Sequence, residues 1–122
     1  NIQDHRFKGA VLLAPIGVLF KGEKSLSNVK VPIRIYRAEN DRVLRYPYHA
    51  ESIRQKLSLK PEFVVVKKAN HYSFLAPFPE SSKNRYGIIA KDQDDFDRVK
   101  FHSIMNQEIF EFLLKSLNDQ RK

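Results

Sequence analysis

The 122-residue sequence contains no cysteine, which excludes both a disulfide framework and thiolate chemistry. It also lacks any apolar run near the ~20 residues that a bilayer-spanning helix needs, so we expect no membrane partner. Its first ten residues mix acidic with basic side chains, a pattern that signal peptides do not show. These absences fit the cytoplasm, and that is the compartment we expect.

The composition of the chain is that of a folded domain. Hydrophobic residues make up 42% and charged residues 30% of it, which argues against disorder, and we expect residues 1–122 to form one domain. The net charge of +8 raises the question of nucleic-acid binding. The basic residues are scattered, however, without an Arg-rich arm or a zinc spacing. We therefore predict a solvated basic surface and no nucleic-acid partner.

Three short runs rich in branched side chains have the length of β-strands. They are GAVLLAP at 9–15, VPIRIYRA at 31–38 and EFVVVKKA at 62–69. The near-continuous hydrophobicity of the first and third indicates strands buried on both faces, as in a parallel sheet. Arg34 and Arg37 interrupt the second run. One of its faces or ends should therefore reach solvent or an acidic partner.

Two other segments carry helical patterns. The spacing predicts a helix over 45–59, with Pro47 in its first turn, and another over 96–117, with Asp97 as N-cap. Residues 79–95 between them are predicted to form a long polar loop. The apolar residues at helical spacing are Ala50, Ile53 and Leu57 in the first helix and Val99, Ile104, Met105, Ile109, Phe112, Leu113 and Leu117 in the second.

The order of these elements predicts the fold class. Strands that alternate with a helix or a long crossover pair in parallel through right-handed connections. We therefore expect a three-layer α/β fold, with a small parallel sheet of three strands in chain order and flanking helices. The chain shows neither an internal repeat nor a low-complexity segment.

Ligands of open parallel sheets bind at the carboxyl ends of the strands, which makes the residues after each run important. The second run is followed by Asp41 and the third by His71. A carboxylate that accepts a hydrogen bond from a histidine orients the imidazole for base catalysis. Taken singly, Asp41 could form an Asx turn and His71 could simply pack in the core. Their arrival at consecutive strand ends favours an acid–base pair.

The sequence resembles the C-terminal part of the dienelactone-hydrolase-like α/β-hydrolases. The resemblance is carried by HRFKGAVLLAP, VKVPIRIYRAENDRVLRYPYHAESI, NHYSFLAPFP and DDFDRVKFHSIMNQEIFEFL, and covers nearly all of the chain. It implies a serine hydrolase acting on an ester or lactone, with Asp41 as the triad acid and His71 as the base. It also implies that the apolar segment 16–20 lies near the substrate pocket. The substrate-binding residues we expect are Ile16, Phe20, Tyr72 and Phe74; for the aromatic residues after His71, a purely structural role in the core stays open.

The nucleophile of that family is absent from this sequence. No serine lies in the G-x-S-x-G pattern that exposes a hydroxyl on a strand-to-helix turn. The serines that we considered are Ser25, Ser27, Ser73 and Ser103. We therefore expect a fragment of a longer hydrolase that is inactive alone, with the nucleophile in an N-terminal portion. Asn70 stands where the family often has glycine before the histidine, and asparagine tolerates left-handed backbone conformations.

The sequence predicts neither a metal site nor a cofactor. No histidine pair has the i, i+4 spacing of a helical zinc site. The acidic cluster at 92–97 lacks the glycine and the closing glutamate of an EF-hand. We expect this cluster to be a solvated loop that leads to the cap of the last helix.

A non-catalytic interaction module is the alternative function. The apolar stretch AVLLA of the first run would form an exposed sheet edge, and such an edge pairs readily with another copy. The alternative therefore predicts a homodimer through this edge, with Arg34 and Arg37 near the contact.

Overall fold

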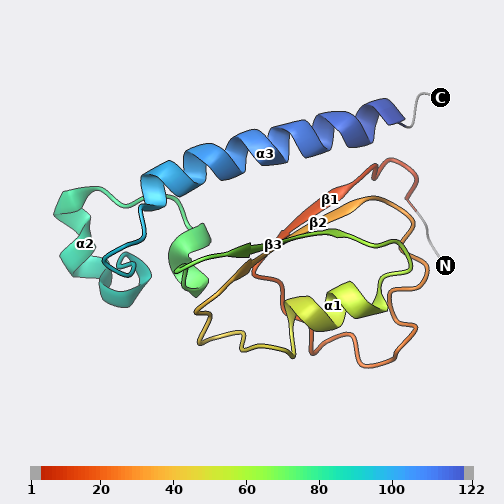
Figure 1. The fold of residues 1–122 in the computed structure, drawn as a ribbon, viewed down its shortest axis with the longest axis horizontal. Helices are drawn as coiled ribbons and strands as arrows, with labels where there is room; N and C mark the ends of the chain where they lie inside the picture. Colours follow the sequence, from red (N-terminus) through yellow and green to blue (C-terminus); the bar gives the residue numbers. More distant parts are fainter. Residues whose placement is uncertain (1–3, 120–122) are drawn as a thin grey trace.

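A parallel sheet of three strands forms the centre of the protein in the computed structural model, which describes residues 4–119 (Figure 1). The strands lie in chain order, and their register pairs Ala10 with Ile33 and Ala38 with Val66. The α/β class and the three parallel strands are thus confirmed. The elements are β1 (Ala10–Leu13), β2 (Ile33–Ala38), α1 (Ala50–Lys56), β3 (Glu62–Val66), η1 (His71–Phe74), α2 (Glu80–Tyr86), η2 (Gly87–Ile89) and α3 (Arg98–Asn118).

The sheet is covered on both faces. In Figure 1, α3 crosses one face and α1 lies against the other, which produces three layers. Alternating residues of the central strand serve the two layers, since successive side chains of a strand point to opposite faces. Tyr36 and Ala38 pack with Met105 of α3, whereas Ile33 and Ile35 pack on the side of α1. The apolar runs read in the sequence therefore bury side chains on both faces.

The helix predicted over 45–59 is shorter in the structure. It spans Ala50–Lys56, and Pro47 lies before the helix rather than in its first turn. A proline disfavours the helical conformation of the residue before it, which keeps Tyr46 out of a helix. His49, with φ of −119° and ψ of −92°, is not helical either, and the helix begins at the next residue. The apolar spacing was correct, because Ala50 and Ile53 are buried and Leu57 packs against them.

The polar loop predicted over 79–95 is wrong, because α2 and η2 occupy more than half of it. None of the residues of α2 is buried, so the segment has no apolar stripe that could reveal a helix. Its end signals were present: Glu80 lies in the first turn, Lys83 in the last, and Gly87 follows with a φ of +50°. Glycine adopts that left-handed conformation at low cost, which makes it a common residue after a helix.

The last helix begins as predicted. Asp97 is the N-cap of α3, and its carboxylate accepts a hydrogen bond from the amide of Lys100 at 2.9 Å. The predicted apolar face is too wide, however. Met105 and Phe112 are buried and Ile109 is partly so, but a helix contacts a sheet along one stripe only. The predicted face residues that remain exposed are Val99, Ile104, Leu113 and Leu117.

The two arginines of β2 both have acidic partners, which was one of the two outcomes expected for this strand. Arg34 pairs with Glu62 of β3 and, at 2.8 Å, with Glu108 of α3. Arg37 Nε lies 2.6 Å from a carboxylate oxygen of Glu51 in α1. Both guanidinium groups are therefore neutralised within the chain, on opposite faces of the central strand.

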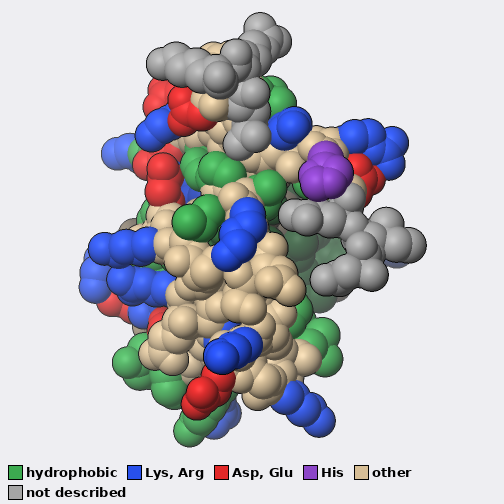
Figure 2. All heavy atoms as spheres, turned by 90° about the vertical axis from the view of Figure 1, so that its right-hand side faces the viewer, with side chains coloured by type: hydrophobic (Ala, Val, Ile, Leu, Met, Phe, Trp, Pro, Cys, Tyr) green, Lys and Arg blue, Asp and Glu red, His purple; other side chains and the backbone are tan. Residues whose placement is uncertain are grey.

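The surface carries the excess positive charge in dispersed form. On the face shown in Figure 2, the Lys and Arg side chains are spread out, with acidic and apolar side chains between them. At the carboxyl end of β3, Lys67 pairs with Glu39 and Lys68 with Asp95. Within residues 4–119, no helix has the length and apolar character that crossing a membrane requires.

Candidate active site

Asp41 lies in the turn that follows β2, and its carboxylate is bound at both oxygens. Oδ1 accepts hydrogen bonds from the backbone amides of Val43 at 2.9 Å and Leu44 at 2.7 Å. Oδ2 lies 2.8 Å from Nδ1 of His71. The Asx turn considered from the sequence is present, but it does not compete with the contact to the histidine. It aims the second oxygen at the imidazole.

His71 is the first residue of η1, just beyond the carboxyl end of β3. The predicted proximity of the acid and the histidine is confirmed by the 2.8 Å contact. Because a carboxylate only accepts, the neutral ring carries its hydrogen on Nδ1 and leaves a lone pair on Nε2. The Asp41 side chain is 4% exposed and that of His71 25%, so the carboxylate is buried while part of the histidine side chain is accessible.

Asn70 fixes the start of the short helix that carries His71. Its side-chain oxygen accepts a hydrogen bond from the backbone amide of Tyr72 at 2.8 Å. Its backbone amide donates to the Ser73 hydroxyl at 3.0 Å. The φ of Asn70 is −103°, so the backbone here is extended and not left-handed. Asparagine thus serves at this position as a helix cap. This corrects the role inferred from its place before the histidine.

One member of the acidic cluster at 92–97, Asp92, departs from the predicted solvated loop. The carboxylate of Asp92 is 12% exposed and forms two hydrogen bonds with Arg98, at 2.6 and 2.9 Å. It also accepts from the hydroxyl of Ser73 at 2.7 Å. Sequence reasoning missed this buried pair, since acids and bases close in sequence usually lie at the surface. The other acids of the cluster, Asp94, Asp95 and Asp97, are exposed in a loop that ends at the cap of α3, as predicted.

Two hollows border His71. One, of about 390 Å³, is lined by Leu13, Ala14, His71, Tyr72, Phe74 and Leu75. The other, of about 290 Å³, lies against polar groups that include Asn40, Arg42 and Gln93. Tyr72 and Phe74, both predicted to bind substrate, thus line the same apolar hollow. Phe74 also packs against the core, as the structural alternative expects.

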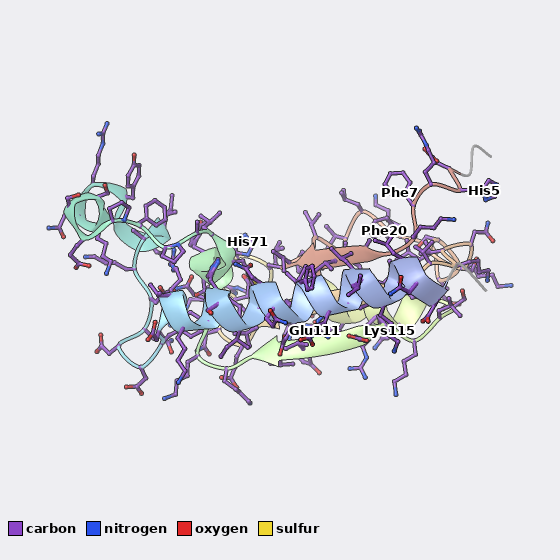
Figure 3. The ribbon with its side chains drawn as sticks, turned by 90° about the horizontal axis from the view of Figure 1, so that it is seen from above. His5, Phe7, Phe20, His71, Glu111 and Lys115 are labelled. Atoms are coloured by element: carbon purple, nitrogen blue, oxygen red, sulfur yellow. The ribbon has the colours of Figure 1, made fainter. Side chains whose placement is uncertain are left out.

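Ile16 and Phe20 lie elsewhere. Phe20 packs against the apolar cluster beneath α1, and its carbonyl accepts from Lys56. Figure 3 shows Phe20 well away from His71, toward the other end of the sheet. Ile16 is exposed and borders neither hollow beside His71. Gly17, within the same segment, lies so close to the backbone of His49 that a side chain would not fit there.

Within residues 4–119, no hydroxyl group forms a hydrogen bond with the His71 side chain. Ser73, the serine nearest to His71 in the chain, is fully buried, and its hydroxyl donates to Asp92. Across residues 4–119, no group of three acidic or histidine side chains could hold a metal ion.

No family model, curated protein or solved structure matches this chain. The case for a function therefore depends on the residues and their geometry.

Proposed function

We propose that this chain supplies the acid and the base of a serine-hydrolase triad that acts on an ester or lactone. The observation that carries the proposal is the 2.8 Å contact between His71 Nδ1 and Asp41 Oδ2 at the carboxyl edge of a parallel sheet. The resemblance to the C-terminal part of dienelactone-hydrolase-like α/β-hydrolases supports it. The apolar hollow beside the imidazole offers room for the hydrocarbon part of a substrate.

In this mechanism, His71 moves one proton in each half of the reaction. Nε2 accepts the proton of a serine hydroxyl while the serine oxygen attacks the carbonyl carbon. The imidazolium then returns that proton to the leaving alkoxide as the C–O bond breaks, which leaves an acyl-serine. Water next gives a proton to Nε2 as it attacks the acyl carbon. That proton passes to the serine oxygen when the acid product leaves. Asp41 keeps Nδ1 protonated throughout.

The serine comes, in this proposal, from a segment outside these 122 residues. The chain contains no G-x-S-x-G pattern, and the hydroxyl of Ser73 is engaged by Asp92. Loss of a triad nucleophile typically lowers turnover about 10⁶-fold. We therefore expect the isolated chain to hydrolyse a nitrophenyl ester at the background rate.

The test uses the protein encoded when the reading frame is followed upstream of Asn1, where we expect the G-x-S-x-G segment. In that protein, Asp41→Asn should lower kcat roughly 10⁴-fold. The asparagine oxygen can still accept from the amides of Val43 and Leu44, but its amide group then donates to Nδ1. The ring hydrogen is forced onto Nε2, which can no longer act as a base.

The companion variant His71→Ala should lower kcat about 10⁶-fold. His5→Ala, at an exposed histidine, is the matched control and should retain the parent rate. Turnover that survives either substitution at Asp41 or His71 would remove that residue from the role. Ester hydrolysis by the isolated chain above background would reveal a nucleophile within it.

We keep a second candidate, a non-catalytic module that dimerises, because of one observation. β1 lies at the end of the sheet order and pairs only with β2 among the described strands. Its last residue, Leu13, is exposed. An open strand edge offers unpaired backbone groups to a second copy of the chain.

A further inference from the structure

We propose that Ser73, Asp92 and Arg98 are positioning residues for His71. They tie η1 to the beginning of α3 and thereby hold the imidazole against Asp41. The inference rests on the proposed function of His71 as the base, but its test needs no enzymatic activity.

The helix that carries His71 cannot hold its own orientation. η1 has four residues, and a helix this short has little stability apart from its tertiary contacts. The only side-chain hydrogen bond of His71 within the described residues is the one to Asp41. The direction of the ring therefore depends on what fixes the backbone of η1.

Ser73 provides the first fixed point. Its side chain is fully buried. Its hydroxyl accepts a hydrogen bond from the backbone amide of Asn70 and donates one to the carboxylate of Asp92 at 2.7 Å. A single hydroxyl thus closes the turn of η1 and joins it to the segment before α3. Its carbonyl provides a second point, since Nε2 of His102 lies 2.9 Å from it. A carbonyl only accepts, so His102 donates this bond from α3.

Arg98 makes the other end of the link rigid. It is the first residue of α3, is 6% exposed, and meets Asp92 with two hydrogen bonds. Both of its terminal nitrogens also donate to the carbonyl of Ile89. A guanidinium fork on a carboxylate has a defined geometry, and a buried pair with satisfied hydrogen bonds resists displacement. The position of the Asp92 carboxylate, which accepts the hydrogen bond from Ser73, is therefore fixed by Arg98.

The test observes the hydrogen on His71 Nδ1 by NMR of the ¹⁵N-histidine-labelled chain, with His71→Asn used to assign the signal. In Ser73→Ala, the Arg98–Asp92 pair is intact but the hydroxyl link to η1 is gone. We expect this hydrogen to exchange with water about tenfold faster than in the parent, because the loss of one buried hydrogen bond eases local opening.

Ser116→Ala is the matched control. It also removes a buried serine hydroxyl, which donates to Phe112 at 2.9 Å, but it lies near the far end of α3. The exchange rate at His71 should stay at the parent value in this variant. Equal exchange in the parent and in a folded Ser73→Ala would overturn the proposal, as would equal acceleration in Ser116→Ala.

A second variant keeps the inference testable if Ser73→Ala does not fold. Arg98→Lys keeps the positive charge beside Asp92 but loses the fork and its bonds to Ile89. It should also accelerate exchange at His71, and an unchanged rate would contradict the proposal. These outcomes are independent of ester turnover. A failed triad and a failed positioning role are therefore distinguishable.

Discussion

At the scale of single residues, function and folding share the same side chains. Asp41 gives one oxygen to the turn after β2 and the other to His71, so the turn that folds locally also orients the proposed base. Tyr36, by contrast, has a structural role only, since its hydroxyl joins β2 to α3. It is 1% exposed, and its hydroxyl donates to Glu108 at 2.7 Å and accepts from Arg34 at 2.8 Å.

Burial, together with the hydrogen bond to Glu108, raises the pKa of Tyr36 to about 12 from 10.0. The folded state therefore holds this proton more tightly than the unfolded state. The stabilisation that results is complete below pH 10 and is lost as the pH rises through about 12. Urea unfolding between these values should show a steeper loss of stability in the parent than in Tyr36→Phe.

The exposed Tyr48 offers the control for this measurement. Tyr48→Phe should retain the slope of the parent. At neutral pH, Tyr36→Phe should lower the free energy of unfolding by about 1 kcal/mol, the usual value of one hydrogen bond. Identical pH slopes for the parent and Tyr36→Phe would show that Tyr36 does not cause this dependence.

At the scale of elements, the helices differ in whether end signals, a buried apolar stripe or both mark them in the sequence. α3 has both, since Asp97 caps its first turn and a buried stripe faces the sheet. α2 has only end signals and exposed residues, together with a contact between the rings of Phe78 and Tyr86, whose centroids lie 5.2 Å apart. Apolar periodicity therefore finds α3 and overlooks α2.

The cap of α3 supports a quantitative prediction. Asp97→Ala removes the acceptor of the Lys100 amide and should lower the free energy of unfolding by about 1 kcal/mol. Asp119, at the other end of α3, is the matched acid, and its charge faces the negative end of the helix dipole. Asp119→Ala should be neutral or slightly stabilising in the same urea titration. A loss of equal size in both variants would exclude a specific capping effect.

At the scale of the whole molecule, helices cover the faces of the sheet, and its two edge strands, β1 and β3, each pair only with β2 among the described strands. The helices on the two faces are seen in Figure 1. The proposed acid and base lie together beyond the carboxyl ends of β2 and β3, where Figure 3 shows His71. The β1 edge is where a further strand could extend the sheet. Either a segment of a longer hydrolase or a second copy of the chain would satisfy its backbone groups.

Pairing of two copies can be tested through Leu13. If the chain dimerises through β1, Leu13→Lys should shift it toward monomer in sedimentation velocity, because a charge on an edge strand opposes pairing. Leu59→Lys changes an exposed leucine outside the sheet and should leave the association unaltered. A parent chain that sediments as a monomer at all concentrations, with the β1 amides protected from exchange, would remove this candidate.

Several features of the site could be read before the structure, and others could not. Asp41 and His71 were found because each follows an apolar run, and parallel strands bring their ends to one edge. The placement of Phe20 near the substrate was an expectation from resemblance that the geometry does not support. The link from Ser73 to Arg98 had no sequence signal, since its members become neighbours only when η1 packs against α3.

The sequence by itself determined the three strands, the cap of α3 and the acid–base pair, because these depend on apolar runs and on side chains next to them in the chain. The tertiary structure alone decided which face of α3 is buried, where the segment 16–20 lies and that Asp92 is buried with Arg98. The first two outcomes depend on contacts between segments far apart in sequence, and the Asp92–Arg98 pair, although local in sequence, lies against Ser73 of η1. Asp92 and Arg98 look like ordinary surface charges in the sequence, and only their burial lets them hold η1 and His71 in the way we propose.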